Sequence, residues 1–299
     1  MGILFLFGAG ASFGSGPCHP SNPPLGKDLL LEMRNEGGVA GTIHGDLLEA
    51  FVQDPEKGMV KFFEERNGDT TPLLKQMSAF LAKYSISEGN LYIELINIIK
   101  KRKSITFATT NYDLLIEQAI SYTGHMIQYH AQERARNNIP LLKIHGSVNF
   151  IPRANFTNCT FILPPHGKAS VIDCEVDVMV DSRQIIEYCN SKTALSPAVA
   201  MYHPDKPVLH CPSFVKMQQE DFKTEIKKSS KIFIIGLKIN PDDTHIWGEL
   251  ENCKADIHII DIDSTATEAW KAKLKKKNIY HSANSFEKSL HVIKSILRI

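Results

Sequence analysis

The sequence has little net charge, no closely paired cysteines and no long apolar run, and each absence excludes a class of protein. Its 34 basic and 33 acidic residues leave a formal net charge of +1, so there is no basic excess of the kind that nucleic-acid binding favours. The apolar run Ile3–Phe7 is too short to span a membrane or to form a signal-peptide core. We therefore expect a cytoplasmic protein that binds neither membranes nor nucleic acid directly.

The six cysteines are scattered along the 299 residues, and none forms the C-x-x-C pair that structural zinc sites use. Reduced thiols are the simplest interpretation of this pattern. We expect no metal site. The hydrophobic content of 43% and the charged content of 22% are those of an ordinary globular protein.

Five short apolar runs predict the strands of a buried parallel sheet. Each run is nearly continuous in apolar residues, as expected for strands that are covered on both faces. Each is followed by polar or Gly residues and then by a helix-like stretch. This alternation predicts an α/β fold with a Rossmann-type doubly wound sheet, in a single domain spanning residues 1–299. The runs are Ile3–Phe7, Ile105–Ala108, Leu141–Ile144, Ile232–Ile235 and Ile257–Ile260.

Two long segments interrupt the alternation. Residues 27–101 are too long for one crossover helix and predict a helical insertion. Residues 150–214 are rich in Pro, Asn and β-branched residues and predict an irregular insertion with one helix at Ser182–Asn190. Asn284 is the expected cap of the C-terminal helix, with Glu287 as its reciprocal partner. The helices expected in the first insertion are Lys27–Asn35, Asp46–Val52, Met59–Arg66, Thr71–Tyr84 and Asn90–Lys101.

Polar and glycine motifs follow the predicted strands, at the carboxyl ends where such sheets bind ligands. Gly8 and Gly10 would let backbone amides approach a pyrophosphate, with Ser12 adding a hydroxyl, although a tight turn accounts for the glycines equally well. The ordinary dinucleotide fingerprint needs a third glycine, which is misplaced here. Asp261 would accept hydrogen bonds from ribose hydroxyls or cap a helix, and Asp263 fits the capping role better.

The middle of the chain supplies an amide, a carboxylate and an imidazole. Asn111 follows the second strand, and its side chain can hold a sugar hydroxyl or orient a water. Asp113 either faces the same pocket or caps the helix that follows. His145 ends the third strand beside Gly146, and a histidine there is either structural or a general base at pH 7. Together these residues predict a nucleotide site with chemistry built into it.

Four motifs, in this order, resemble the sirtuin family, and most of all the sirtuin-like domains of bacterial anti-phage defence systems. The resemblance implies a sheet that binds NAD+ and cleaves the bond between nicotinamide and ribose. Val148-Asn149-Phe150 also resembles the continuation of the third motif in that branch. The motifs are Phe7–Ser12, Thr110–Asp113, Lys143–Ser147 and Ile234–Gly236.

The resemblance implies a role for each motif residue. Asn111 would contact the nicotinamide ribose and position water, Asp113 would line the nicotinamide pocket, and His145 would be the base. Thr110, also expected beside NAD+, stands where deacetylating sirtuins have glutamine. The other expected contacts are Gly8, Ala9, Gly10 and Ser12 around the pyrophosphate, and Gly236, Leu237 and Asp261 along the adenosine half.

Deacetylating sirtuins carry a four-cysteine zinc module after the His-Gly motif, and residues 150–214 have no paired cysteines. This departure favours water as the acceptor. The expected function is therefore that of an NAD+ glycohydrolase that depletes NAD+ in anti-phage defence. The alternatives are a zinc-free NAD-dependent protein deacylase and a non-catalytic sensor of NAD+ or ADP-ribose. The resemblance also implies a homo-oligomer and a separate partner, such as a HerA-type ATPase.

Overall fold

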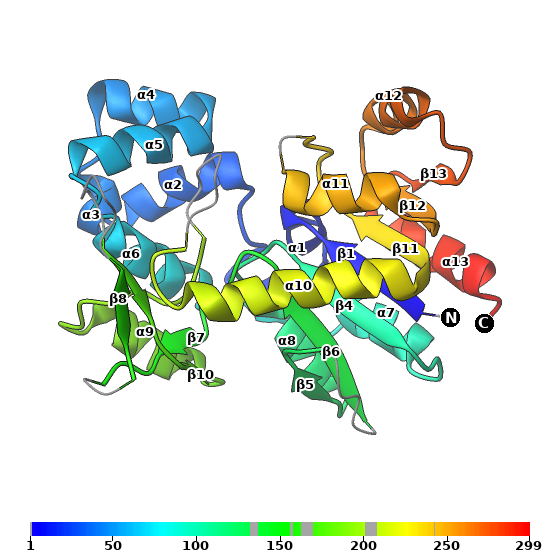
Figure 1. Cartoon of the computed structure of the whole chain (residues 1–299), viewed down its shortest axis with the longest axis horizontal. Helices are drawn as coiled ribbons and strands as arrows, with labels where there is room; N and C mark the ends of the chain where they lie inside the picture. Colours follow the sequence, from blue (N-terminus) through cyan, green and yellow to red (C-terminus); the bar gives the residue numbers. More distant parts are fainter. Residues whose placement is uncertain (1, 132–136, 156–157, 163–169, 201–207, 242) are drawn as a thin grey trace.

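The computed structural model describes residues 2–131, 137–155, 158–162, 170–200, 208–241 and 243–299. Its centre is a sheet of seven strands, ordered β13-β12-β11-β1-β4-β6-β5 (Figure 1). All neighbouring strands in it are parallel. The strands are β1 (Gly2–Phe7), β4 (Ile105–Thr109), β5 (Met126–Gln128), β6 (Asn138–Lys143), β11 (Ser229–Ile235), β12 (Asp256–Ile260) and β13 (Ile279–Ala283).

The central strand β1 shows why this sheet is buried on both sides. Phe5 and Phe7 belong to one apolar cluster, whereas Leu4 and Leu6 belong to a second. Successive side chains of a strand point to opposite faces, so a continuous apolar run packs against both layers of helices. The five predicted strands and the doubly wound architecture are confirmed.

Helices cover both faces of the sheet (Figure 1). The cluster around Phe5 and Phe7 includes residues of α7 (Leu91–Ile99), α8 (Leu115–Tyr122) and α13 (Phe286–Leu297). The cluster around Leu4 and Leu6 includes residues of α10 (Pro212–Lys228), α11 (Thr244–Asn252) and α12 (Ser264–Leu274). None of the helices in the described ranges is long and apolar enough to cross a membrane.

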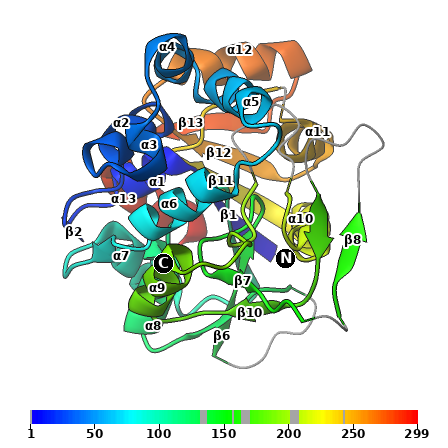
Figure 2. The same ribbon diagram turned by 90° about the vertical axis from the view of Figure 1, so that its left-hand side faces the viewer.

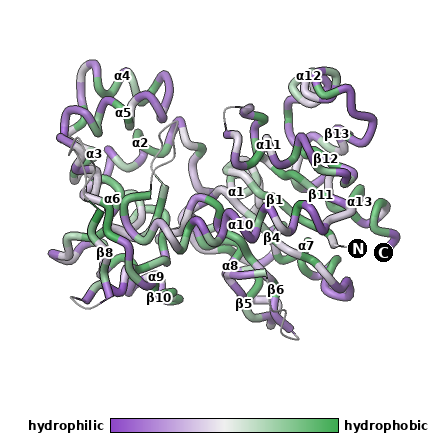
Figure 3. Tube along the Cα trace, viewed as in Figure 1, coloured by the Kyte–Doolittle hydropathy of each residue, from purple (hydrophilic) through white to green (hydrophobic). Residues whose placement is uncertain are grey.

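The two edge strands escape the sequence pattern because they lack a continuous apolar run. Met126 of β5 is 65% exposed and Tyr280 of β13 is 43% exposed. A strand at the edge of a sheet has less apolar surface to bury, so its composition is less distinctive. The segment that joins α12 to β13 is hydrophilic (Figure 3).

The two insertions form a second lobe beside the sheet (Figures 1 and 2). The expected helices of the first insertion are present, although their ends differ by up to four residues. The last of them, α7, packs against α8 and α13 and so covers the sheet. In the second lobe, α6 packs against α9 of the second insertion. The lobe's helices are α2 (Gly26–Asn35), α3 (Gly38–Gly41), α4 (Gly45–Gln53), α5 (Pro55–Glu65), α6 (Thr71–Leu81) and α9 (Ser182–Asn190).

The second insertion contains short strands that the sequence did not predict. They pair as two antiparallel ribbons, β7 with β10 and β8 with β9. Residues 156–157, 163–169 and 201–207 of this insertion lie outside the described ranges. The strands are β7 (Phe150–Pro152), β8 (Thr160–Ile162), β9 (Val171–Asp173) and β10 (Val176–Val178), and a further small pair elsewhere joins β2 (Cys18–His19) to β3 (Ser85–Ile86).

The predicted cap of the C-terminal helix is wrong by one residue. Ser285 is the N-cap of α13, and its Oγ accepts a hydrogen bond from the backbone N of Lys288. Asn284 precedes that cap. Both residue types are good caps, so composition alone does not choose between neighbours.

Candidate functional site

The parallel arrangement brings the predicted motifs to one edge of the sheet. Gly8 follows β1, Asn111 lies two residues beyond β4, His145 lies two residues beyond β6 and Gly236 follows β11. These four strands are adjacent in the order β11-β1-β4-β6. The chain leaves β1 toward β4 and later returns to its other side at β11, which makes the space beyond β1 and β11 a topological switch point. Ligands of doubly wound sheets bind at such points.

The glycines allow two loops to pack closely at this switch point. The backbone N of Gly10 donates to the carbonyl oxygen of Gly236 at 2.9 Å. A Cβ on Gly8 would lie 2.5 Å from that oxygen and 2.6 Å from Cα of Leu237. Gly236 has a φ of +61°, a conformation that glycine adopts without strain. The glycines are therefore needed for the close packing of these two loops, and their phosphate-binding role stays a prediction.

Asn111 joins the first two motifs. Its Nδ2 donates to the carbonyl oxygen of Gly8 at 2.9 Å and to Oγ of Ser12 at 3.0 Å. Its backbone N donates to Oγ1 of Thr109 at 3.0 Å. The side chain is buried, so these bonds hold its amide group in one orientation. The structure therefore brings together Gly8, Ser12 and Asn111, which are up to 103 residues apart in the sequence.

Tyr92 of α7 extends this cluster and was missed in the sequence, where it lies in a helix with no motif. Its hydroxyl is 3.1 Å from Oγ of Ser12. Burial, followed by the charge of Asp113, raises the pKa of Tyr92 well above its ordinary value. The phenol is therefore neutral, and it can donate or accept one hydrogen bond at Ser12.

Asp113 lies just before helix α8, whose N-cap position is occupied by Leu114. Its Oδ1 accepts from the backbone N of Leu115, at the start of α8, at 3.1 Å. Beneath it, the Nζ of Lys143 donates to the carbonyl oxygen of Asp113 at 2.6 Å and lies 3.0 Å from Oε1 of Glu117. Burial raises the pKa of Glu117, and the charge of Lys143 opposes that rise. This buried ion pair joins the end of β6 to helix α8, next to the candidate site. Lys143 begins the Lys143–Ser147 motif, whereas Glu117 gave no signal in the sequence.

His145 faces a second histidine that the sequence did not single out. Its Nε2 lies 2.8 Å from Nε2 of His245, the second residue of α11. His145 is buried at 6% exposure, and its carbonyl oxygen accepts from the backbone N of Ala200 at 2.8 Å. Gly146 follows at a φ of +80°, and a Cβ there would lie 2.0 Å from the carbonyl oxygen of Ala198. The backbone around His145 is therefore held tightly.

The remaining predicted residues separate into capping and ligand-side positions. Asp263 is confirmed as a cap, because its Oδ1 accepts from the backbone N of Thr265 and of Ala266 at 3.0 Å each. Asp261 lies before it, and its Oδ1 accepts from the backbone N of Asp263 at 3.0 Å. Ala9 is exposed, whereas Thr110 and Leu237 are partly exposed. All three have surface that a ligand can contact.

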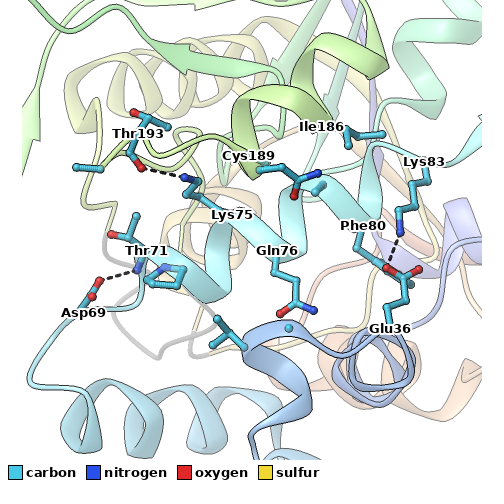
Figure 4. A pocket seen from close by; sticks show the side chains of 16 residues that line it. Glu36, Asp69, Thr71, Lys75, Gln76, Phe80, Lys83, Ile186, Cys189 and Thr193 are labelled. Carbon is cyan, nitrogen blue, oxygen red and sulfur yellow. Dashed lines mark hydrogen bonds and ion pairs between the residues drawn. The ribbon is translucent and has the colours of Figure 1, made fainter.

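A cavity of about 710 Å³ lies elsewhere, in the second lobe between α6, α9 and the α2–α3 segment (Figure 4). The buried Lys75 lies on its wall, and its Nζ donates to the carbonyl oxygens of Ser191 and Thr193 at 2.8 Å each. Lys83 pairs with Glu36 at the opposite end. None of the predicted site residues lines this cavity.

The cysteines of the described residues do not gather into a metal-ligand group. No group of three or more His, Cys, Asp or Glu among them can hold a metal ion. All six cysteines are free thiols. Cys174 and Cys211 lie in contact, with Sγ atoms 3.5 Å apart, and burial raises the pKa of both thiols.

Comparisons with known proteins identify the fold. Residues 105–207 match the family model described as a SIR2-like domain. A solved structure from work on the mechanism and regulation of Sir2 enzymes is 13% identical, with 99% of this chain and 92% of that chain covered and a TM-score of 0.50. No curated protein matches the chain. The chain therefore has a sirtuin-like fold, and its residues 105–207 are similar to a SIR2-like domain.

Two other solved structures show the same coverage with lower TM-scores. An ADP-ribose complex of a Sir2 homologue is 14% identical, covers 99% of this chain and 93% of its own, and has a TM-score of 0.46. A Sir2 complex with a p53 peptide and NAD+ is 12% identical, covers 99% and 93%, and has a TM-score of 0.44.

Proposed function

We propose that the protein is an NAD+ glycohydrolase that cleaves NAD+ to nicotinamide and ADP-ribose. One observation carries the proposal. Gly8, Ser12 and Asn111 form a single hydrogen-bonded cluster at the carboxyl ends of β1 and β4, and His145 follows the next strand. In a sirtuin fold this arrangement puts an orienting amide and a titratable imidazole at the ligand edge of the sheet.

The reaction needs little covalent chemistry from the protein. The bond between C1′ of the ribose and the nicotinamide nitrogen breaks, and its electron pair leaves with neutral nicotinamide. The oxygen of a water molecule bonds to C1′, and the released proton passes to His145. Asn111 orients the water and the ribose. Positioning and a fixed polar environment supply most of the acceleration.

The dinucleotide would extend across the switch point. Gly8, Ala9, Gly10 and Ser12 would border the pyrophosphate and its neighbouring ribose. The adenosine half would follow Gly236, Leu237 and Asp261, whereas Thr110 and Asp113 would lie toward the nicotinamide. The buried position of Asn111 supports this direction, because the bond to be cleaved then lies deepest and is shielded from bulk water.

A protein deacylase is the second candidate, and one observation favours it. The β7–β10 ribbon directly follows the His-Gly-Ser motif, and an extended backbone there offers an edge to which a peptide can add as a strand. Thr110 in place of glutamine and the lack of paired cysteines in residues 150–214 favour hydrolysis. A non-catalytic sensor would use the same contacts but bind NAD+ without turnover.

The three candidates give different products. We would incubate the purified chain with NAD+, with and without an acetylated lysine peptide, and quantify nicotinamide, ADP-ribose and O-acetyl-ADP-ribose by chromatography. A glycohydrolase releases nicotinamide and ADP-ribose in equal amounts without peptide. Nicotinamide release that requires the peptide and yields O-acetyl-ADP-ribose would replace hydrolysis with deacylation. NAD+ binding without any product would identify a sensor.

We also propose that NAD+ depletion serves anti-phage defence, as the sirtuin-like resemblance implies. Such an activity would be toxic at rest, so restraint by a homo-oligomer or by a separate partner such as a HerA-type ATPase follows. The helical insertion, residues 27–101, is the proposed assembly surface. Size-exclusion chromatography with light scattering, followed by infection of cells that carry the chain with its genomic neighbour, tests both parts.

A further inference from the structure

Two imidazoles meet at the proposed catalytic base. Nε2 of His145 and Nε2 of His245 are 2.8 Å apart, and the ring planes are tilted by 46°. A neutral imidazole carries one N–H and one lone pair. At this distance one ring must donate and the other must accept, because two facing N–H groups cannot form the bond. The contact therefore ties the tautomer of His145 to that of His245.

His245 lies at the start of a helix. It is the second residue of α11, Thr244–Asn252. The first turn of a helix carries a positive partial charge, which disfavours an imidazolium there and favours a neutral ring. A neutral ring can donate or accept at Nε2, so the direction of the bond follows from the proposed role of His145. A base must present a lone pair to water, and because Nε2 of His145 is held by His245, that lone pair lies on Nδ1 and the Nε2–H of His145 donates to His245.

We propose that His245 is the positioning residue of this site: its Nε2 accepts the Nε2–H of His145, which makes Nδ1 of His145 the nitrogen that takes the proton from water. This role rests on the proposed function. His245 comes from α11, which follows β11, whereas His145 follows β6 on the other side of β1. The logic is that of a nucleophile or base oriented by a third group, as in catalytic triads.

His145 takes up the one proton that the hydrolysis releases. Before the reaction, His145 carries its proton on Nε2 and His245 is neutral. Water gives its proton to Nδ1 of His145 as the water oxygen bonds to C1′. His145 becomes an imidazolium, and its Nε2–H bond to His245 strengthens because the donor is now charged. Bulk solvent takes the extra proton after the products leave.

The same contact links the base to the ligand-binding loops. The loop between β11 and α11 begins at Gly236, which receives the hydrogen bond from Gly10. His245 follows on the helix that this loop leads into. On the opposite side, the Nε2 of Gln219 in α10 donates to the carbonyl oxygen of Ile144 at 3.1 Å. His145 is therefore oriented by its ring partner and by its backbone together.

The test uses the full chain with His245→Ala and His245→Gln. We expect His245→Ala to lower kcat about 100-fold with KM for NAD+ changed less than about threefold, because the base is misoriented and binding is intact. Gln retains an oxygen that can accept from Nε2–H, so His245→Gln should recover a measurable part of that loss. Added imidazole should raise the rate of His245→Ala and leave that of His145→Ala unchanged. The exposed His291→Gln is the matched control and should behave as wild type.

An NMR measurement separates this inference from the proposed function. With ¹⁵N-labelled histidine, the wild type should show His145 protonated on Nε2, and His245→Gln should keep that tautomer. If wild type releases no nicotinamide, the proposed function fails while the tautomer still tests the positioning. If wild type is active and His245→Ala keeps full kcat, or if His145 is protonated on Nδ1, the inference is overturned.

Discussion

Gly236 is the position at which one added methyl group tests the packing of the two ligand-side loops. Its φ of +61° costs an alanine about 1–2 kcal/mol. The new Cβ would also lie 2.1 Å from the backbone N of Ala11 and 2.4 Å from the carbonyl carbon of Gly10. Both neighbours are backbone atoms, so a whole loop must shift, at a cost of about 1–3 kcal/mol. Gly236→Ala should therefore destabilise the protein by about 2–5 kcal/mol in total.

Two further glycines separate the cost of the backbone conformation from the cost of the steric clash. The free energy of unfolding is measured in urea, with circular dichroism as the signal. Gly124 has a φ of +77° with no atom within 4 Å of its added Cβ, so Gly124→Ala should cost only the conformational part, about 1–2 kcal/mol. Gly248 lies inside α11, where its added Cβ meets nothing closer than 3.9 Å. Gly248→Ala should stabilise the protein by about 0.5–1 kcal/mol. Equal losses for Gly236→Ala and Gly124→Ala would refute the loop packing.

Three other perturbations have defined outcomes. Lys75→Met removes both hydrogen bonds of the buried lysine and should cost about 1–3 kcal/mol by thermal unfolding; an unchanged Tm would show that the lysine is dispensable. Burial lowers the pKa of His258 from 6.5 to about 4, so the fold prefers the neutral ring. Its contribution is complete above pH 6.5 and is lost as pH falls toward 4. The free energy of unfolding of the wild type, measured in urea, should therefore fall between pH 6.5 and 4, and His258→Gln should reduce that fall by at most about 3 kcal/mol. The same pH dependence of the free energy in both proteins would contradict this. Asp263→Ala should cost about 1 kcal/mol of helix capping with KM for NAD+ unchanged, whereas Asp261→Asn should raise KM; the reverse pattern would exchange their roles.

The central sheet could be predicted because its strands bury both faces. Leu4 to Phe7 are all fully buried, and a continuous apolar run of this length is typical of a central strand in an α/β fold. The edge strands β5 and β13 could not be predicted in this way, because Met126 and Tyr280 remain substantially exposed. The short ribbons of the second insertion are three-residue strands, too short to show an alternating pattern.

The candidate site was predictable where a residue follows a strand. Gly8, Asn111, His145 and Gly236 all do, and parallel strands bring their carboxyl ends together. His245 is different, because it reaches the site from the first turn of a helix. The sequence placed His245 shortly after Gly236, in a segment with a helix-like pattern. Because an ordinary position in a helix explained the residue, nothing singled it out as part of the site. Tyr92 and Glu117 had no local signal, and the motif that contains Lys143 did not indicate its ion pair, since only the packing of separate elements defines these contacts.

Nicotinamide release from NAD+ by the wild-type chain, Asn111→Ala and His145→Ala tests the proposed site most directly. The exposed Asn97→Ala and His291→Gln serve as matched controls, and circular dichroism establishes that every variant is folded. We expect both site variants to lose about 100-fold or more of the wild-type rate, because each removes an orienting or proton-accepting group. Equal rates in wild type and both site variants would contradict the assignment of Asn111 and His145.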